Sequence, residues 1–178
     1  MATIEHLKDF KVKSGDVLFF DTNIWMLIFS SKIGGARMKE QMLYSNLFND
    51  VLSAGATIFI NSLVVSEYIN ANLRIEYDRW KRRPENIINN EYKKYFRPSK
   101  DYISSQVTAC AEVREILKMA EKKPDDFNVF ELSEIYLNNK LDYNDAYYVW
   151  YCDKNRLIFV SDDKDVLDTP IDVRILTI

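Results

Sequence analysis

The chain has 178 residues, with 24 basic and 27 acidic side chains, for a formal net charge of −3. That length suits one domain carrying an insertion, and an apolar share of 47% provides a buried core and excludes a disordered chain. The two cysteines, Cys110 and Cys152, form no CxxC motif, which excludes a zinc ribbon or disulfide framework and favours reduced thiols in a cytoplasmic protein. Residues 1–16 lack the apolar stretch of a secretory signal, and the longest apolar run, 17–29, is too short and polar to cross a membrane.

The single histidine, His6, limits the available chemistry. One imidazole nearly excludes Ser-His-Asp and Cys-His catalysis, as well as His-rich metal sites. The sequence also contains neither GxGxxG nor GxxxxGK[ST], so the usual nucleotide-binding loops are not expected. Any catalysis must therefore depend mainly on carboxylates.

Apolar runs alternate with helical periodicity along the chain. The elements predicted up to residue 80 are a buried strand at 17–20, a helix at 24–30, a helix at 38–52 closed by Gly55, a buried strand at 57–60 and a helix at 61–80 capped by Asn61 or Ser62. A polar, basic stretch follows at 81–100. The remaining predicted elements are a helix at 102–122 ended by Pro124, a short helix at 132–139, a helix from Asp142 or Asn144 to about Asp153, a strand at 157–160 and an edge strand at 173–176.

This alternation predicts an α/β fold with a mostly parallel sheet covered by helices on both faces. Ligands of such sheets bind beyond the carboxyl ends of the strands. Asp21 and Asp163 each follow a predicted strand, and Glu67 lies in the helix that follows another. We therefore expect three carboxylates at one edge of the sheet.

Charge is unevenly distributed. Residues 74–100 contain nine basic and four acidic side chains, a net +5, which leaves −8 for the rest of the chain. A basic segment beside an acidic centre suits an enzyme that acts on polyphosphate, but a solvated helical surface has the same composition. The candidate nucleic-acid-binding residues are Arg79, Lys81, Arg82, Arg83, Lys93, Lys94 and Arg97. The interleaved aromatic residues either stack unpaired bases or, as we expect, pack the segment onto the body: Tyr77, Trp80, Tyr92, Tyr95 and Phe96.

Each acidic residue has a purely structural explanation when taken alone. Asp21 could cap a helix, Glu67 could lie exposed on an amphipathic helix, and Asp145 could favour a helix start together with Asp142. The Asp162–Asp165 cluster could be a solvated turn. Together, however, carboxylates at one edge repel unless protons or a divalent cation neutralise them. Oxygen ligands select Mg²⁺ or Mn²⁺ over zinc, and such an ion supports phosphodiester hydrolysis.

Four short motifs occur in a fixed order along the chain. They are Asp21-Thr22-Asn23 after a strand, Glu67 in NSLVVSEYIN, Asp145-Ala146 opening an apolar helix, and Ser161-Asp162-Asp163-Lys164-Asp165 after the strand at 157–160. The ordered set resembles the PIN-domain ribonucleases, including the toxin-type VapC relatives, over about 17–73 and 130–178. The resemblance implies a three-layer α/β/α fold over 1–178 as a single domain, with a helical, basic insertion at about 74–126.

The resemblance also implies roles for individual residues. Asp21, Glu67, Asp145 and Asp163 would form a catalytic acidic quartet that holds one or two Mg²⁺ or Mn²⁺ ions. Asp165 would ligate through water. Asn23 and Ser161 would orient the carboxylates through hydrogen bonds, and Asp142 is an alternate for Asp145. The implied activity is metal-dependent endoribonuclease cleavage of RNA.

The implied partners are single-stranded RNA, an antitoxin or other regulatory protein, and a second copy of the chain in a homodimer; no membrane contact is expected. Three other interpretations stay open on the sequence. The chain could be a non-catalytic PIN-like module that binds nucleic acid or protein, or a structure-selective DNA nuclease. Phosphoryl transfer through an aspartyl-phosphate on Asp21 fits poorly, because haloacid-dehalogenase-like enzymes want an Asp where Asn23 stands.

Overall fold

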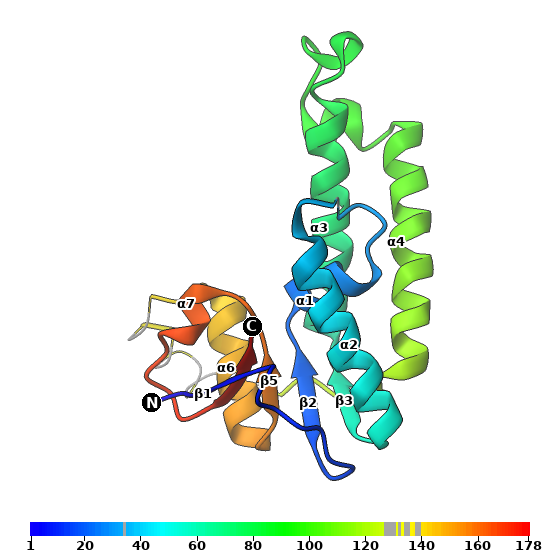
Figure 1. Ribbon diagram of the computed structural model, residues 1–178. Helices are drawn as coiled ribbons and strands as arrows, with labels where there is room; N and C mark the ends of the chain where they lie inside the picture. The colour runs from blue at the N-terminus through cyan, green and yellow to red at the C-terminus, as the bar shows by residue number, and fades with distance from the viewer. Residues whose placement is uncertain (34, 127–130, 132, 134–135, 138–139) are drawn as a thin grey trace.

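An all-parallel β-sheet lies at the centre of the fold (Figure 1). The structure is a computed structural model that describes residues 1–178 except 34, 127–130, 132, 134–135 and 138–139. Within the described residues the sheet has six strands in the order β1-β6-β5-β2-β3-β4. The strands are β1 (Thr3–His6), β2 (Val17–Phe20), β3 (Thr57–Ile60), β4 (Glu121–Lys122), β5 (Ile158–Val160) and β6 (Arg174–Thr177).

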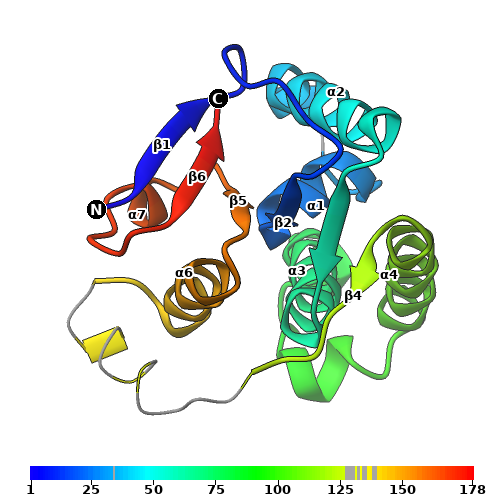
Figure 2. The same cartoon turned by 90° about the horizontal axis from the view of Figure 1, so that it is seen from below.

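Helices cover both faces of this sheet. The described helices are α1 (Thr22–Phe29), α2 (Met38–Ala54), α3 (Ser62–Trp80), α4 (Lys100–Met119), α6 (Tyr143–Asn155) and α7 (Lys164–Leu167), with short turns η1 (Gly35–Arg37), η2 (Pro84–Asn86) and η3 (Tyr92–Phe96). Successive side chains of a strand point to opposite faces. In β2, Phe19 packs against Tyr148 of α6, whereas Phe20 packs against Trp25 of α1 and Phe48 of α2. Figure 2 shows α6 and α2 on opposite sides of the sheet, which confirms the predicted three-layer α/β/α fold.

Local sequence signals define several element ends. Gly55 closes α2 in the left-handed conformation, at φ +66°, which glycine adopts without a steric penalty. The side-chain oxygen of Asn61 accepts a hydrogen bond from the Val64 amide at 3.1 Å and caps α3. The strands predicted at 17–20 and 57–60, and the helix predicted to reach Trp80, are confirmed.

A long antiparallel pair, α3 and α4, extends past the carboxyl ends of the strands (Figure 1). The Tyr68 hydroxyl of α3 donates to Glu112 of α4 at 2.9 Å, and the Lys32 ammonium reaches Glu76 on α3 and Ser105 on α4, both at 2.9 Å. These buried and half-buried polar contacts fix the pair to the body. The basic segment therefore lies at the far end of a rigid helical pair.

The N-terminal strand was not predicted. We expected His6 to lie near a frayed end, but residues 3–6 pair in parallel with β6 along Thr3–His6. The strand predicted at 173–176 exists, as β6, but it is not an edge strand, because β1 lies outside it. The exposed side chains of β1, such as Ile4 at 46% exposed, give its sequence no apolar alternation to reveal it.

Two further expectations need correction. The helix predicted at 102–122 ends at Met119, because Glu121 and Lys122 leave it to pair in parallel with Phe59 and Ile60 as β4. A short helix, α7, follows Asp163 where we expected only a turn. The helix predicted at 132–139 falls largely outside the described residues.

Both cysteines are free thiols: Cys110 is exposed and Cys152 is buried. Burial raises the pKa of the Cys152 thiol and keeps it protonated. Among the helices that the structure describes, none combines the length and apolar character needed to cross a lipid bilayer.

Candidate active site

A polar cleft of about 350 Å³ opens beyond the carboxyl end of β2, between the first turns of α1 and α6 and one side of α3. Its lining comprises Asp21, Thr22, Asn23, Glu67, Asn70, Ala71, Arg74, Asp142, Asn144, Asp145 and Asp163. The fold thus brings all four members of the expected acidic quartet into one cleft, together with Asn23 and Asp142. Ser161 lies directly behind it, and Asp165 does not line it.

Strand register explains the position of Asp21. Phe20 of β2 is paired with Val160 of β5, so the next residues along the two strands, Asp21 and Ser161, lie side by side. The Asp21 amide donates to the Val160 carbonyl at 3.0 Å, and the Ser161 hydroxyl donates to Asp21 Oδ2 at 2.7 Å. Asp21 is only 3% exposed.

Burial dominates the protonation of Asp21. Desolvation raises its pKa to about 7, opposed by the Ser161 hydrogen bond and reinforced by the charges of Glu67 and Asp163. An ionised carboxylate that is buried away from water beside other carboxylates is costly without a counter-charge. The cleft is therefore suited to taking up positive charge.

Glu67 is held by three donors from two neighbouring helices. Thr22 Oγ1 donates to Glu67 Oε2 at 2.8 Å, the Tyr148 hydroxyl donates to the same oxygen, and Asn144 Nδ2 donates to Oε1. A carboxylate offers about four lone-pair positions, so most of those of Glu67 are occupied by protein donors. Glu67 thereby joins α3 to α1 and α6 at the floor of the cleft.

Asp142 and Asp145 occupy the start of α6. Asp142 Oδ1 accepts from the amides of Asn144 at 2.9 Å and Asp145 at 3.0 Å, so Asp142 is the helix cap. Asp145 lies one turn inside the helix, where its pKa is raised to about 8 by partial burial and then by the charges of Asp142, Asp21 and Asp163. The two residues thus have different local roles, although both line the cleft.

The motif after β5 forms the last wall. The Ser161 hydroxyl accepts from the Asp163 amide at 3.1 Å, and Asp163 Oδ1 accepts from the Asp165 amide at 2.9 Å, so Asp163 caps α7. Asp162 turns away to pair with Arg37. Asp165 is exposed on the first turn of α7. Of the three aspartates, only Asp163 lines the cleft.

The donor chemistry of the cleft fits a hard divalent cation. Its acidic ligands are all oxygen, which favours Mg²⁺ or Mn²⁺. After burial, the charges of Glu67 and Asp163 help to raise the pKa values of both Asp21 and Asp145, which indicates a shared excess of negative charge. Within the described residues no three side chains stand in a ready-made coordination cluster. A cation would therefore bind by drawing carboxylates together or through retained water, as Mg²⁺ commonly does.

The expected nucleic-acid-binding residues lie outside this cleft. Several of them pair with neighbours: Lys81 with Asp78, Arg83 with Glu76 and Asp101, Lys94 with Glu91, and Arg79 with the Lys32 carbonyl. Lys93, Arg82 and Arg97 are exposed, and none of them lines the cleft. The cation that does line the cleft is Arg74, which we had counted only as part of the basic segment.

The aromatic residues of the segment pack mainly on one another. Tyr77 stacks with Trp80 at 6.4 Å between ring centroids and meets Tyr92 edge-on at 5.0 Å, and the fully buried Phe96 contacts all three rings. Tyr95 instead lies beneath the Lys94 ammonium, 5.0 Å from its ring centroid. The expectation that these rings pack the segment therefore fits Tyr77, Trp80, Tyr92 and Phe96.

Sequence reasoning missed the residues that hold Glu67. Asn144 and Tyr148 lie four residues apart on one face of α6, and Asn144 precedes the expected Asp145. Arg74 lies seven residues after Glu67, on the same face of α3. Helical spacing from the quartet members was the signal that could have revealed all three.

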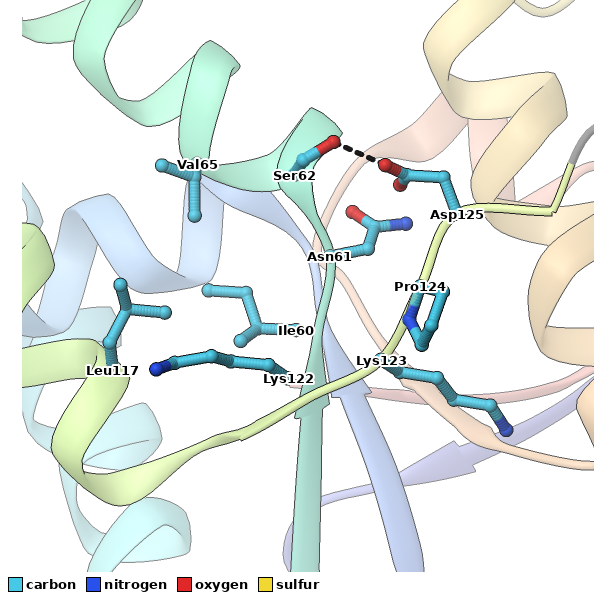
Figure 3. A pocket seen from close by; sticks show the side chains of 9 residues that line it. All are labelled: Ile60, Asn61, Ser62, Val65, Leu117, Lys122, Lys123, Pro124 and Asp125. Carbon is cyan, nitrogen blue, oxygen red and sulfur yellow. Dashed lines mark hydrogen bonds between the residues drawn. The ribbon is translucent and has the colours of Figure 1, made fainter.

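A separate apolar cavity of about 420 Å³ lies beside the ends of β3 and β4 (Figure 3). The side chain of Asn61 points toward the segment that carries Pro124 and Asp125, and the Ser62 hydroxyl donates to Asp125. None of the quartet carboxylates lines it. The quartet therefore belongs to the cleft at the end of β2 and not to this cavity.

Comparison with known proteins adds information on the fold. No family model and no curated protein sequence matches the chain. Among solved structures, VapBC2 from Rickettsia felis, solved bound to a DNA fragment from their promoter, matches with a TM-score of 0.57 at 14% identity, covering 90% of this chain and 98% of that one. PAE2754 from Pyrobaculum aerophilum matches with a TM-score of 0.49 at 14% identity, covering 97% and 92%.

The fold is PIN-like. The match to VapBC2 extends over most of both chains, so the likeness concerns the overall fold rather than a fragment of it. At 14% identity the likeness concerns the fold alone. The chemistry of the cleft must therefore be argued from its own residues.

Proposed function

We propose that this chain is a metal-dependent endoribonuclease of the PIN family. The observation that carries the proposal is the convergence of Asp21, Glu67, Asp145 and Asp163 in one polar cleft at the carboxyl end of a parallel sheet. Their order along the sequence and the PIN-like fold support the same assignment. Separate structural roles for the individual carboxylates would not explain why all four lie in one cleft.

Asp21, Asp145 and Asp163 would hold Mg²⁺ or Mn²⁺ directly. Glu67, whose oxygens already accept three hydrogen bonds, would act through water, as would Asp165. The bound ion supplies Lewis acidity, lowering the pKa of a water molecule and stabilising charge on a phosphodiester oxygen.

The residues of the chain keep this arrangement in place. Ser161 fixes the orientation of the Asp21 carboxylate while it also accepts from the Asp163 amide, so a single hydroxyl holds one carboxylate and the backbone that carries another. Glu67 clamps Asn144 and Tyr148, which holds the start of α6 and its Asp145 beside α3. Such outer contacts typically affect metal affinity or activity by 10- to 100-fold.

Partners follow from the same proposal. The VapBC2 neighbour is a toxin–antitoxin complex that was solved bound to a DNA fragment from their promoter. The likeness in fold supports an antitoxin or other regulatory protein as a partner of this chain. Self-association into a homodimer is the second partner to test. Light scattering of the purified chain, alone and after copurification with a neighbouring gene product, measures both directly.

Cleavage of labelled single-stranded RNA and DNA by the purified chain tests the activity. We expect RNA cleavage with Mg²⁺ or Mn²⁺, none in EDTA, and a loss of at least about 100-fold in Asp21→Asn. Asp50→Asn, at an exposed residue of α2 that does not line the cleft, is the matched control and should cleave normally. Cleavage of DNA alone would replace the proposal with a DNA nuclease. No cleavage of either substrate would favour a binding module.

A further inference from the structure

A second hollow adjoins the acidic cleft. It measures about 510 Å³ and is lined by Asn70, Arg74, Tyr77, Asp78 and Tyr92. Two of these residues, Asn70 and Arg74, also line the cleft that contains the carboxylates. The two hollows therefore form one continuous surface along α3, leading from the quartet toward η3.

Helical geometry places the contributing residues in a row. Glu67, Asn70, Arg74 and Tyr77 follow one another at spacings of three and four, so they share one face of α3. At 1.5 Å per residue, Arg74 lies about 10 Å and Tyr77 about 15 Å along the helix from Glu67. This row has the length needed to hold nucleotides that flank a bond cleaved at the quartet.

Arg74 is the cation of this row and is available to bind an anion. Among the described residues it takes part in none of the ion pairs, and its side chain is exposed. The nearby carboxylate of Asp78, one turn further on, is paired with Lys81 at 2.5 Å. Arg74 thus presents an exposed guanidinium, engaged in no ion pair of the described residues, at the rim of the acidic cleft, where it can bind a phosphate.

Tyr92 forms the far wall of the second hollow. Its ring is held edge-on against Tyr77 at 5.0 Å and Tyr102 at 6.2 Å, and it contacts the buried Phe96 at 5.3 Å. The Tyr77 hydroxyl donates to the Asn90 carbonyl at 2.5 Å and fixes the turn that carries η3. A half-buried ring held on several sides, with its remaining surface in a hollow, is the form of a stacking platform for an unpaired base.

We infer that single-stranded RNA lies along this face of α3, with Arg74 binding a phosphate beside the scissile bond and Tyr92 stacking a flanking base. This inference rests on the proposed nuclease function and names how its substrate is held. It assigns recognition to the side of α3 rather than to the charged residues at the tip of the helical pair. The single strand is favoured because a base in a duplex cannot reach a ring recessed in the hollow.

Binding of a fluorescein-labelled single-stranded RNA, followed by anisotropy in EDTA, tests both contacts without cleavage. Arg74→Met should weaken binding about tenfold and reduce the slope of log K against log salt by about 0.7, the value for one phosphate contact on a single strand. Arg114→Met, which removes an exposed arginine of α4 that lines neither hollow, is the matched control. Equal effects of the two variants would overturn the phosphate contact.

The stacking contact requires a position-specific measurement. RNAs that each carry one abasic nucleotide at a different position should bind about tenfold more weakly when the missing base is the one stacked on Tyr92. Tyr92→Leu should abolish this loss of affinity and leave the slope of log K against log salt unchanged. Tyr92→Phe keeps the ring and should bind as the unmodified chain does, which separates stacking from folding. Tyr95→Leu, on the same turn, is the control. An abasic penalty unaffected by Tyr92→Leu would overturn the stacking contact.

The binding and cleavage assays separate the two proposals. Binding that depends on Arg74 and Tyr92, without RNA cleavage in Mg²⁺ or Mn²⁺, would keep the binding surface and remove the nuclease assignment. RNA cleavage by the unmodified chain, with normal RNA binding by the Arg74 and Tyr92 variants, would keep the nuclease assignment and remove the binding surface. No RNA binding between about 50 and 200 mM salt overturns the inference.

Discussion

The Tyr148 hydroxyl of α6 donates a hydrogen bond to Glu67 Oε2 of α3, joining two residues 81 positions apart in the chain. Tyr148 is 1% exposed, and burial together with the Glu67 charge raises the pKa of its hydroxyl. The hydroxyl therefore keeps its proton at physiological pH and remains a donor. This contact links the two helices that carry half of the acidic quartet.

Replacing Tyr148 by Phe should lower the free energy of unfolding by about 2 kcal/mol, because a hydrogen bond to a charged acceptor is removed inside the protein. Tyr151→Phe is the matched control on the same helix, since its hydroxyl donates to the neutral Pro124 carbonyl at 3.2 Å. That change should cost about 1 kcal/mol. Urea unfolding measures both. Only Tyr148→Phe should also reduce RNA cleavage, and equal effects on cleavage would contradict the role given to Glu67.

The buried carboxyl of Asp21 should make the metal-free chain less stable as pH rises. Its pKa is about 7 in the folded chain against an ordinary 3.8, so the folded state holds this proton more tightly than the unfolded state does. The contribution is full below about pH 4 and is lost as pH rises through about 7. A shift of this size corresponds to about 4 kcal/mol in the free energy of unfolding.

Asp21→Asn removes this titration. In EDTA the variant should be more stable than the unmodified chain at about pH 8 and should show a smaller change between about pH 5 and pH 8. Asp50→Asn replaces an exposed aspartate of α2 and should leave the pH profile unchanged. Urea unfolding at both pH values measures the difference. Identical profiles for the unmodified chain and Asp21→Asn would show that Asp21 does not hold its proton.

Divalent cations should reverse this loss of stability. Asp21 and Asp145, with pKa values of about 7 and about 8, must release protons before they can bind a cation, so the stabilisation by Mg²⁺ or Mn²⁺ should grow from about pH 6 to about pH 8. A cation at a hundredfold excess over its Kd adds about 2.7 kcal/mol. Thermal unfolding with and without the ions measures the effect. Asp145→Asn should reduce it strongly, and an undiminished shift in that variant would place the ion elsewhere.

The sequence specified those parts of the fold in which local signals and tertiary packing agree. Residues 17–20 and 57–60 are apolar runs that become buried strands, and Asn61 caps α3 as its position suggested. In contrast, β1 and β4 exist because their backbones pair with β6 and β3, and short exposed strands carry no hydrophobic pattern of their own. Pairing across the sheet is a tertiary property, which local periodicity does not encode.

The same division applies to the cleft. The position of Asp21 beside Ser161 follows from parallel strands that end in register, so a sequence pattern could anticipate it. The hold of Asn144 and Tyr148 on Glu67 depends on how α6 packs against α3. Arg74 was hidden among nine basic residues of similar appearance, and only the path of α3 separates it from the others.

Ser161 offers the sharpest test of how the cleft controls its own charge. Its fully buried hydroxyl donates to Asp21 Oδ2 at 2.7 Å and accepts from the Asp163 amide at 3.1 Å. The donated bond lowers the pKa of Asp21, so Ser161→Ala should move the pH midpoint of the stability profile upward from about 7. The variant should also lose about 1–3 kcal/mol, because buried polar groups lose their partner.

Ser105→Ala provides the comparison for Ser161→Ala. Ser105 is also buried, at 3% exposed, and its hydroxyl accepts a bond from Lys32 at 2.9 Å, far along the chain from the carboxylates. Its loss should lower the free energy of unfolding without moving the pH midpoint. Because the two serines differ mainly in what they contact, a midpoint shift restricted to Ser161→Ala assigns the effect to Asp21. A shift in both variants, or in neither, would mean that the Ser161 hydroxyl does not set the protonation of Asp21.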